Sequence, residues 1–307
     1  MKRLCLFAEF HPKGQISEYV VHYVRALSQV ADVYYWADCD MPQQELDKLL
    51  PYVRSARAQR HGKYDFGSWQ ALIYQLGWEF VAKYEECLFV NDSVFGPIFP
   101  LENVFQKSDA QPQLGAWALN SFEGTHFGSF FFALRPPVLL STGFKQFIEQ
   151  IAPQQDVGDV IRLYEKKLPQ LVQEAGANYK VLNNRIPSVF NDWKSAVRDR
   201  WPVLKIQPFT RKTLYADRQW LPGWRTFLKK HTDYPVELIE SHLRSVGIDP
   251  DLFDTPSFWI KSVWWALQRG RRKAFRIHFH KQERICILFG ITLLNTEPSG
   301  KHLVAEL

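Results

Sequence analysis

The feature that most constrains the fold is an alternation of short apolar segments with amphipathic helical segments. Residues 4–10 are apolar and are followed by the turn-prone residues 11–14, which is typical of a buried strand. Apolar side chains recur at three- and four-residue spacing in residues 17–29, and this spacing predicts a helix. Residues 33–36 supply a second strand. Such a strand–helix–strand unit favours a parallel, right-handed sheet.

The same alternation continues along the chain. A helix is expected over residues 68–80 and a strand over 86–90. The elements expected after these are strands at 114–119 and 128–134, and helices at 143–151 and 159–175. We therefore predict an α/β fold with a mainly parallel central sheet and flanking helices, in which ligands bind at the carboxyl ends of the strands.

Composition narrows the class of protein. A chain of 307 residues with 46% hydrophobic and 23% charged residues is neither disordered nor a multi-span membrane protein. It has no run of eighteen apolar residues, and its first ten residues lose their apolar character too soon for a signal peptide, so a cytoplasmic location is expected. The four cysteines are scattered, which argues against zinc and redox motifs.

Two polar corners of the predicted sheet carry candidate binding residues. The corner at Asn91-Asp92-Ser93 follows a buried strand directly, and its carboxylate can hold a divalent cation, bond to hydroxyl groups, or simply cap the turn. The corner at residues 60–69 contains Arg60, Tyr64, Asp65 and Gly67. In this corner we expect Gly67 to allow close backbone approach and Ser68 to cap the following helix, whose N-terminus favours an anion.

Two residues in the second half are candidate proton acceptors. His126 follows a polar turn and precedes a buried strand, so it is expected at a margin of the sheet. Glu165 is an acid among apolar neighbours on a predicted helix. Either residue could deprotonate a hydroxyl group, although a lone histidine is usually structural and a helical glutamate usually solvated. The periodicity does not choose between them.

The C-terminal region is basic and aromatic. Residues 257–289 interleave tryptophan and aliphatic residues with eight lysines and arginines, a composition that binds anionic lipid surfaces. A solvated basic face packed against the main domain is the alternative interpretation, and nucleic-acid binding is a less favoured one. We expect a main domain over residues 1–235 and a basic helical appendage over 236–307.

Several segments together resemble the rhamnan synthesis protein F family, bacterial glycosyltransferases of the GT-A type that build surface polysaccharides. The most specific are YDFGSW at residues 64–69 followed by NDSVFGP at 91–97. HFGSFFFALRP and VIRLYEKKLPQLVQEAG also match, and the matches run in family order from residue 4 to about residue 210. The resemblance does not cover the basic C-terminal region.

The resemblance implies a nucleotide-diphospho-sugar transferase fold with a donor half at residues 1–110 and an acceptor half at 111–235. It implies that Asp92 is the metal or diphosphate carboxylate, and that Arg60, Tyr64, Asp65, Gly67, Asn91 and Ser93 contribute to the donor pocket. The implied donor is a nucleotide sugar such as dTDP-rhamnose or UDP-galactose, with Mn²⁺ or Mg²⁺. One carboxylate stands here instead of the two of a full DxD motif, so metal-dependent and metal-independent transfer both stay open.

The predicted reaction is transfer of a sugar to a saccharide or polyprenyl-diphosphate-linked acceptor, in O-antigen, capsule or rhamnan synthesis at the inner face of the cytoplasmic membrane. His126 or Glu165 would activate the acceptor hydroxyl. The net charge of +6 suits an anionic donor, acceptor and membrane surface, and no nucleic-acid partner is expected. The alternative function is that of a non-catalytic carbohydrate-binding subunit in a polysaccharide assembly complex.

Overall fold

A computed structural model describes residues 1–122, 126–182, 193–210, 221–255, 284–288 and 291–296. The chain divides into two compact units. Residues 1–207 and 225–247 form the first unit, and residues 208–224 and 248–307 form the second. Every candidate site residue named above belongs to the first unit. The division of the chain into residues 1–235 and 236–307 stays a prediction.

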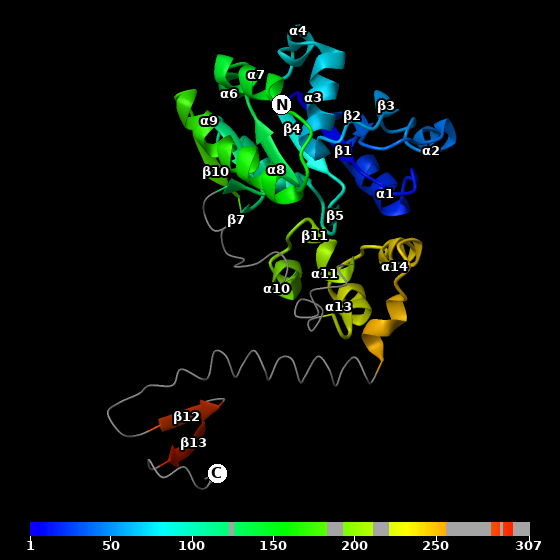
Figure 1. The fold of residues 1–307 in the computed structure, drawn as a ribbon, viewed down its shortest axis with the longest axis vertical. Coiled ribbons are helices and arrows are strands. Elements are labelled where there is room, and N and C mark those ends of the chain that lie inside the picture. The colour runs from blue at the N-terminus through cyan, green and yellow to red at the C-terminus, as the bar shows by residue number, and fades with distance from the viewer. Residues whose placement is uncertain (123–125, 183–192, 211–220, 256–283, 289–290, 297–307) are drawn as a thin grey trace. The chain divides into compact units, whose positions relative to one another are not determined.

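The first unit is built on a seven-stranded sheet with the order β10-β6-β9-β4-β1-β2-β3 (Figure 1). All neighbouring strands are parallel except at β9, which runs antiparallel to both β4 and β6. The predicted α/β fold with a mainly parallel sheet is therefore confirmed. The strands are β1 (Arg3–Glu9), β2 (Asp32–Ala37), β3 (Ser55–Ala58), β4 (Glu86–Asn91), β6 (Leu114–Ala118), β9 (Phe131–Leu134) and β10 (Asn178–Val181).

Three two-stranded sheets complete the β structure of the described residues. Their pairs are β5 (Val94–Phe95) with β11 (Leu204–Lys205), β7 (Ser121–Phe122) with β8 (His126–Phe127), and β12 (Arg284–Leu288) with β13 (Ile291–Thr296). The helical appendage was predicted partly on residues 256–283, which lie outside the described residues. Within that appendage, residues 284–288 and 291–296 form strands rather than helix.

Helices cover both faces of the sheet. Because successive residues of a strand point to opposite faces, Leu4, Leu6 and Ala8 of β1 join the core cluster with α3, whereas Phe7 packs against Tyr23 of α1. The helices are α1 (Glu18–Leu27), α2 (Gln43–Asp47), α3 (Tyr64–Leu76), α4 (Trp78–Val81), α5 (Glu102–Asp109), α6 (Pro136–Leu139), α7 (Thr142–Glu149), α8 (Val157–Leu163), α9 (Leu168–Glu174), α10 (Trp193–Arg198), α11 (Gln207–Thr210), α13 (Trp224–His231) and α14 (Val236–Ser245), with 3₁₀ helices η1 (Glu165–Lys167) and η2 (Pro250–Asp254).

Two predicted helices differ from those observed. The helix expected over 68–80 begins at Tyr64 and gives way to a second helix, α4, after Gly77. The helix expected over 159–175 divides into α8, η1 and α9, and Pro169 stands in the first turn of α9, where proline can begin a helix but cannot continue one. Glu165 consequently lies in a short 3₁₀ segment. Among the described residues, no helix has the length and apolar character needed to cross a bilayer.

Trp69 anchors α3 to the middle of the sheet. Its ring packs edge-on against Phe89 of β4 and Phe132 of β9, at centroid distances of 5.4 and 5.5 Å. Its indole nitrogen donates to the carbonyl of Val90 at 3.3 Å, which satisfies the one polar atom of this buried side chain. The contact fixes the start of α3 beside the end of β4, where the polar corners lie.

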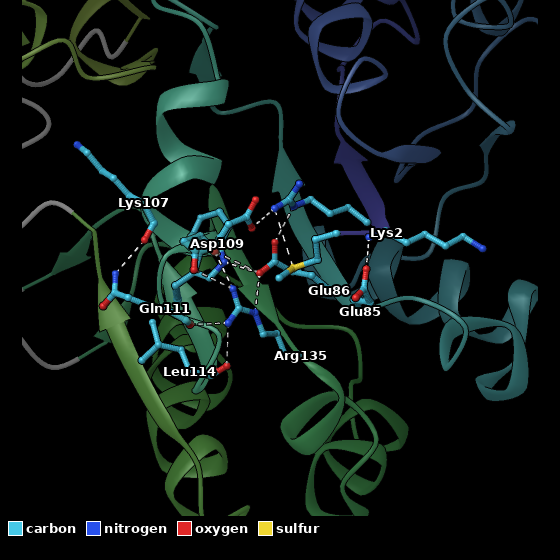
Figure 2. A network of polar contacts seen from close by, with 12 residues as sticks. Lys2, Glu85, Glu86, Lys107, Asp109, Gln111, Leu114 and Arg135 are labelled. Carbon is cyan, nitrogen blue, oxygen red and sulfur yellow. Dashed lines mark hydrogen bonds and ion pairs between the residues drawn. The ribbon is translucent and has the colours of Figure 1, made fainter.

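A buried ion network joins neighbouring strands at the other edge of the sheet, where β1 and β4 begin (Figure 2). The carboxylate of Glu86, at the start of β4, is fully buried and accepts hydrogen bonds from Arg3 at 2.9 Å, Arg135 at 3.0 Å and Trp117 at 2.7 Å. Arg3 also pairs with Asp109 of α5. Since every charge in the network has a partner, the network can stay buried.

Candidate functional site

The two polar corners meet at the carboxyl edge of the sheet. Asn91 is the last residue of β4, and its amide nitrogen donates to Oδ2 of Asp65, in the first turn of α3, at 2.5 Å. The amide oxygen of Asn91 accepts from both the backbone N–H and the hydroxyl group of Ser93. Residues from the two corners that the sequence proposed, Asp65 from one and Asn91 and Ser93 from the other, therefore form one connected cluster.

Asp92 lies beside this cluster at the ends of β1 and β4. Its backbone N–H donates to the carbonyl of Ala8 at 3.2 Å, and its carboxylate accepts from the N–H of Phe10 at 3.5 Å. Burial raises the pKa of Asp92 to about 7, and the negative charge of Asp65 adds to the increase. Two neighbouring carboxylates with raised pKa values make a site that favours a bound positive charge.

Lys205, which was not among the predicted site residues, supplies a cation to this cluster. It lies on β11, which pairs with β5, and its ammonium group donates to Ser93 Oγ at 2.9 Å. Its charge lowers the pKa values of Asp65, Asp92 and Glu165 against the stronger effect of burial. No local pattern could have revealed it, because 112 residues separate it from Ser93.

The two candidate proton acceptors form a pair. His126 Nε2 lies 3.6 Å from Oε2 of Glu165, and both side chains are largely buried. Burial raises the pKa of Glu165 to about 7, the charge of Asp65 raises it further, and a hydrogen bond from Ser129 opposes the increase. The charges of Asp65 and Lys205 therefore act on Glu165, which links the candidate acid–base pair electrostatically to the polar cluster.

The loop before α3 is held by Asp38, a second residue that the sequence analysis missed. The Asp38 carboxylate accepts from the backbone N–H groups of His61, Gly62 and Tyr64 at 2.6, 2.9 and 3.2 Å. It thus takes the capping role predicted for Ser68, and the helix begins four residues earlier than expected. A signal did exist in the sequence, since Asp38 directly follows β2 at the same edge of the sheet as Asp92.

Arg60 and Tyr64 flank this loop. Arg60 is exposed, and its guanidinium lies 5.5 Å from the ring centre of Phe10, which is also exposed. Tyr64 has a φ of 57°, a left-handed conformation that is uncommon for a residue with a side chain. The structure thus places Arg60 over the turn that follows β1, next to the N–H that bonds Asp92.

The close approach that Gly67 allows is made by the protein itself. Gly67 lies inside the first turn of α3, and Lys63 and His61 of the preceding loop fill the space beside it. A Cβ at this position would lie 2.2 Å from the Cβ of Lys63 and 2.6 Å from Cε1 of His61. The glycine is required for the close packing of the loop on the helix, while Ser68 bonds to His61 at 3.2 Å instead of capping.

Replacing Gly67 with alanine is therefore expected to lower the free energy of unfolding by about 1–3 kcal/mol, because the added methyl group has no space. Urea denaturation measures the change. Gly143 is the matched control: it is also helical, but the nearest atom to an added Cβ is 3.8 Å away, so Gly143→Ala should be neutral or stabilising by up to about 1 kcal/mol. Equal effects of the two substitutions would contradict this account of Gly67.

The carboxylates suit a divalent cation that also binds phosphate. Within the described residues no group of three histidine, cysteine or acidic side chains gathers as a metal site. Mg²⁺ commonly binds through one or two carboxylates together with phosphate oxygens of a substrate, and Asp92 with Asp65 offers such a pair. The pKa of Asp92 is raised mainly by burial and further by the negative charge of Asp65, and a bound cation would offset both effects.

Comparison with known proteins identifies a family. The family model for rhamnan synthesis protein F matches residues 36–289, so the match extends through the basic region that the resemblance by motifs was expected to leave out. No curated protein sequence matches the chain. The match covers more than half of the chain, and the mainly parallel sheet described above agrees with the α/β fold class expected for this family.

Several solved structures are similar in part. The glycosyltransferase GlyE from Streptococcus pneumoniae TIGR4 is 14% identical over 81% of this chain, with a TM-score of 0.44, and the match spans 65% of the length of GlyE. A putative nucleotide-diphospho-sugar transferase from Desulfovibrio desulfuricans G20 is 16% identical, covering 75% of this chain and 99% of that one, with a TM-score of 0.37. Mannosyltransferase PcManGT from Pyrobaculum calidifontis, solved with GDP-Man and Mn²⁺, is 7% identical, covering 87% and 75%, with a TM-score of 0.41.

Proposed function

The chain belongs to the rhamnan synthesis protein F family, and from this premise we propose that it is a glycosyltransferase that moves a sugar from a nucleotide-diphosphate donor to a saccharide or lipid-linked acceptor. The observation that carries the proposal is the cluster at the carboxyl edge of the sheet. There the charge of Asp65 acts on both Asp92 and Glu165, and the charge of Lys205 acts on all three acids.

The donor is bound through its diphosphate. Lys205 and Arg60 offset the charge of the leaving group, and Asn91 and Ser93 hold Asp65 and Lys205 in position. Asp92 and Asp65 are the residues that would hold Mn²⁺ or Mg²⁺, and such an ion stabilises the negative charge of the departing diphosphate. In many enzymes, electrostatic stabilisation of this kind makes the largest contribution to the acceleration of the reaction.

The acceptor is activated by Glu165. Its carboxylate removes the proton from the acceptor hydroxyl while that oxygen attacks the anomeric carbon and the diphosphate leaves. His126, at 3.6 Å, orients the carboxylate. We propose a donor such as dTDP-rhamnose or UDP-galactose. The proposed acceptor is linked to polyprenyl diphosphate and lies at an anionic membrane surface. The basic segment proposed to contact that surface lies mostly outside the described residues.

The pH dependence of the reaction tests the role of Glu165. Because a base must be ionised and the pKa of Glu165 is about 7, the rate should rise about tenfold per pH unit below pH 7 and level off above it. Glu165→Gln should lower the rate and make this rise shallower, because the ionisation of Asp92, whose pKa is also about 7, still contributes to it, whereas His126→Asn should shift the midpoint of the rise. Rates of nucleotide release between pH 5.5 and 9 measure both effects. An unchanged profile in Glu165→Gln would assign the base elsewhere.

A panel of nucleotide sugars tests the function itself. The purified protein should release a nucleoside diphosphate from one donor in the presence of an acceptor, and that donor should raise its melting temperature. At a hundred times the dissociation constant, ligand binding adds about 2.7 kcal/mol of stability. Repeating the panel with and without Mn²⁺ tests metal dependence. Binding without turnover of any donor would favour the non-catalytic carbohydrate-binding role instead.

A further inference from the structure

Helix α10 ends in a backbone motif that glycine usually occupies. The N–H of Arg200 donates to the carbonyl of Val197 at 3.0 Å, and the N–H of Trp201 donates to the carbonyl of Ala196 at 2.8 Å. These are the two hydrogen bonds of a Schellman motif, and they place Arg200 at its left-handed position, with a φ of 56°. An arginine is disfavoured in this conformation, so its presence calls for a reason other than stability.

The Arg200 side chain borders two cavities of the first unit. Its guanidinium lies 4.7 Å from the ring centre of Phe99, a contact that orients the group. One cavity has a volume of about 560 Å³ and the other about 400 Å³, and Arg200 and Pro100 line both. Because neither cavity is lined by Asp65, Asp92 or Glu165, they are separate from the donor cluster.

The larger cavity combines positive charge with an apolar wall. Arg200, Lys229 and Lys230 line it together with one acid, Asp233. Lys229 also faces Glu237 at 3.7 Å, but both side chains are more than half exposed, and such a surface pair neutralises little. Apolar surface of the cavity comes from Pro97, Ile98, Phe99, Pro100, Tyr234 and Pro235.

We propose that this cavity binds a phosphate-bearing ligand, with Arg200 as the anchoring cation and with the apolar wall beside the body of the ligand. Guanidinium groups bind phosphate through two parallel hydrogen bonds, and the lysines add charge. Arg200 stands five residues before Lys205 of the donor cluster, so the Cα atoms of these two residues lie within about 18 Å of each other. On the proposed function, on which this assignment rests, the cavity holds the phosphate end of a lipid-linked acceptor.

Calorimetric binding of farnesyl diphosphate and of inorganic pyrophosphate to the full chain tests the proposal. Arg200→Gly should weaken binding at least about tenfold, as expected for loss of a charge-assisted hydrogen bond. The same variant should melt no lower than the parent protein, because glycine suits the left-handed position. The control Lys83→Gln removes an exposed cation beyond α4 and should change neither result. All titrations are repeated in a Lys205→Met background, which suppresses binding of diphosphate at the donor cluster.

The outcomes separate the possible ligands. Tighter binding of farnesyl diphosphate than of pyrophosphate, lost in Arg200→Gly, supports a lipid phosphate; equal, arginine-dependent binding of both supports a free phosphate group. Binding that is unchanged in Arg200→Gly overturns the proposal, as does a marked fall in the melting temperature of this variant. Since the measurement needs no turnover, arginine-dependent binding by a protein that transfers no sugar would overturn the proposed function alone.

Discussion

Asp92→Asn should lower the rate of sugar transfer by about 10²–10³-fold and at the same time leave the melting temperature unchanged or higher. Asparagine keeps the shape of aspartate and can still accept from the N–H of Phe10. It removes the negative charge that would balance a bound divalent cation. It also removes the repulsion from Asp65 that helps to raise the pKa of Asp92 to about 7, so the folded state loses an unfavourable interaction.

Opposite effects on rate and stability distinguish this role from a structural one. Initial rates under saturating donor, together with thermal unfolding at pH 8, measure both quantities. Asp47→Asn is the control, since Asp47 is an exposed carboxylate of α2, and it should change neither. An Asp92→Asn protein that keeps a third or more of the parent rate would remove Asp92 from the mechanism.

Glu86→Gln should lower the free energy of unfolding by about 3–5 kcal/mol. The substitution leaves the guanidinium groups of Arg3 and Arg135, both buried, without their shared counter-charge. It also places an amide N–H₂ group in a carboxylate site that accepted hydrogen bonds from four side chains. Urea denaturation at neutral pH gives the difference from the shift in midpoint, provided that the slope of the transition is unchanged.

The neighbouring residue gives a matched control. Glu85 is exposed and accepts from the backbone N–H of Lys2 at 2.5 Å, so Glu85→Gln should cost less than about 1 kcal/mol. Figure 2 shows Glu85 bonded only to the backbone of Lys2, and Glu86 inside the network of polar contacts. Similar losses for both substitutions would mean that burial of the Glu86 network contributes nothing specific.

The helices and strands that could be predicted from the sequence are those that the local pattern of apolar and polar residues determines. Apolar runs located β1, β2 and β4, and the polar residues after them located the Asp65–Asn91 cluster, because parallel strands bring their carboxyl ends to one edge. The pairing of His126 with Glu165 was not predicted. It depends on how β8 and η1 fold together, and periodicity carries no information about such a contact.

The parts that could not be predicted depend on contacts between distant residues. Asp38 caps a loop more than twenty residues away, so the start of α3 was placed at its own serine instead. Lys205 reaches the cluster through the pairing of β11 with β5. The left-handed conformation of Arg200 was not predicted either, since the sequence shows an arginine where the motif alone would indicate glycine.

The two ends of strand β4 have different roles. At its first residue, Glu86 is held in the buried ion network, and at its last residue Asn91, followed by Asp92, contributes to the polar cluster. Four residues of β4 lie between Glu86 and Asn91, so the buried anchor and the polar corner are separate parts of one strand. Exchanging the loops at the carboxyl end of β4 is therefore expected to leave the Glu86 network intact, which makes this sheet a scaffold on which other polar corners can be tested.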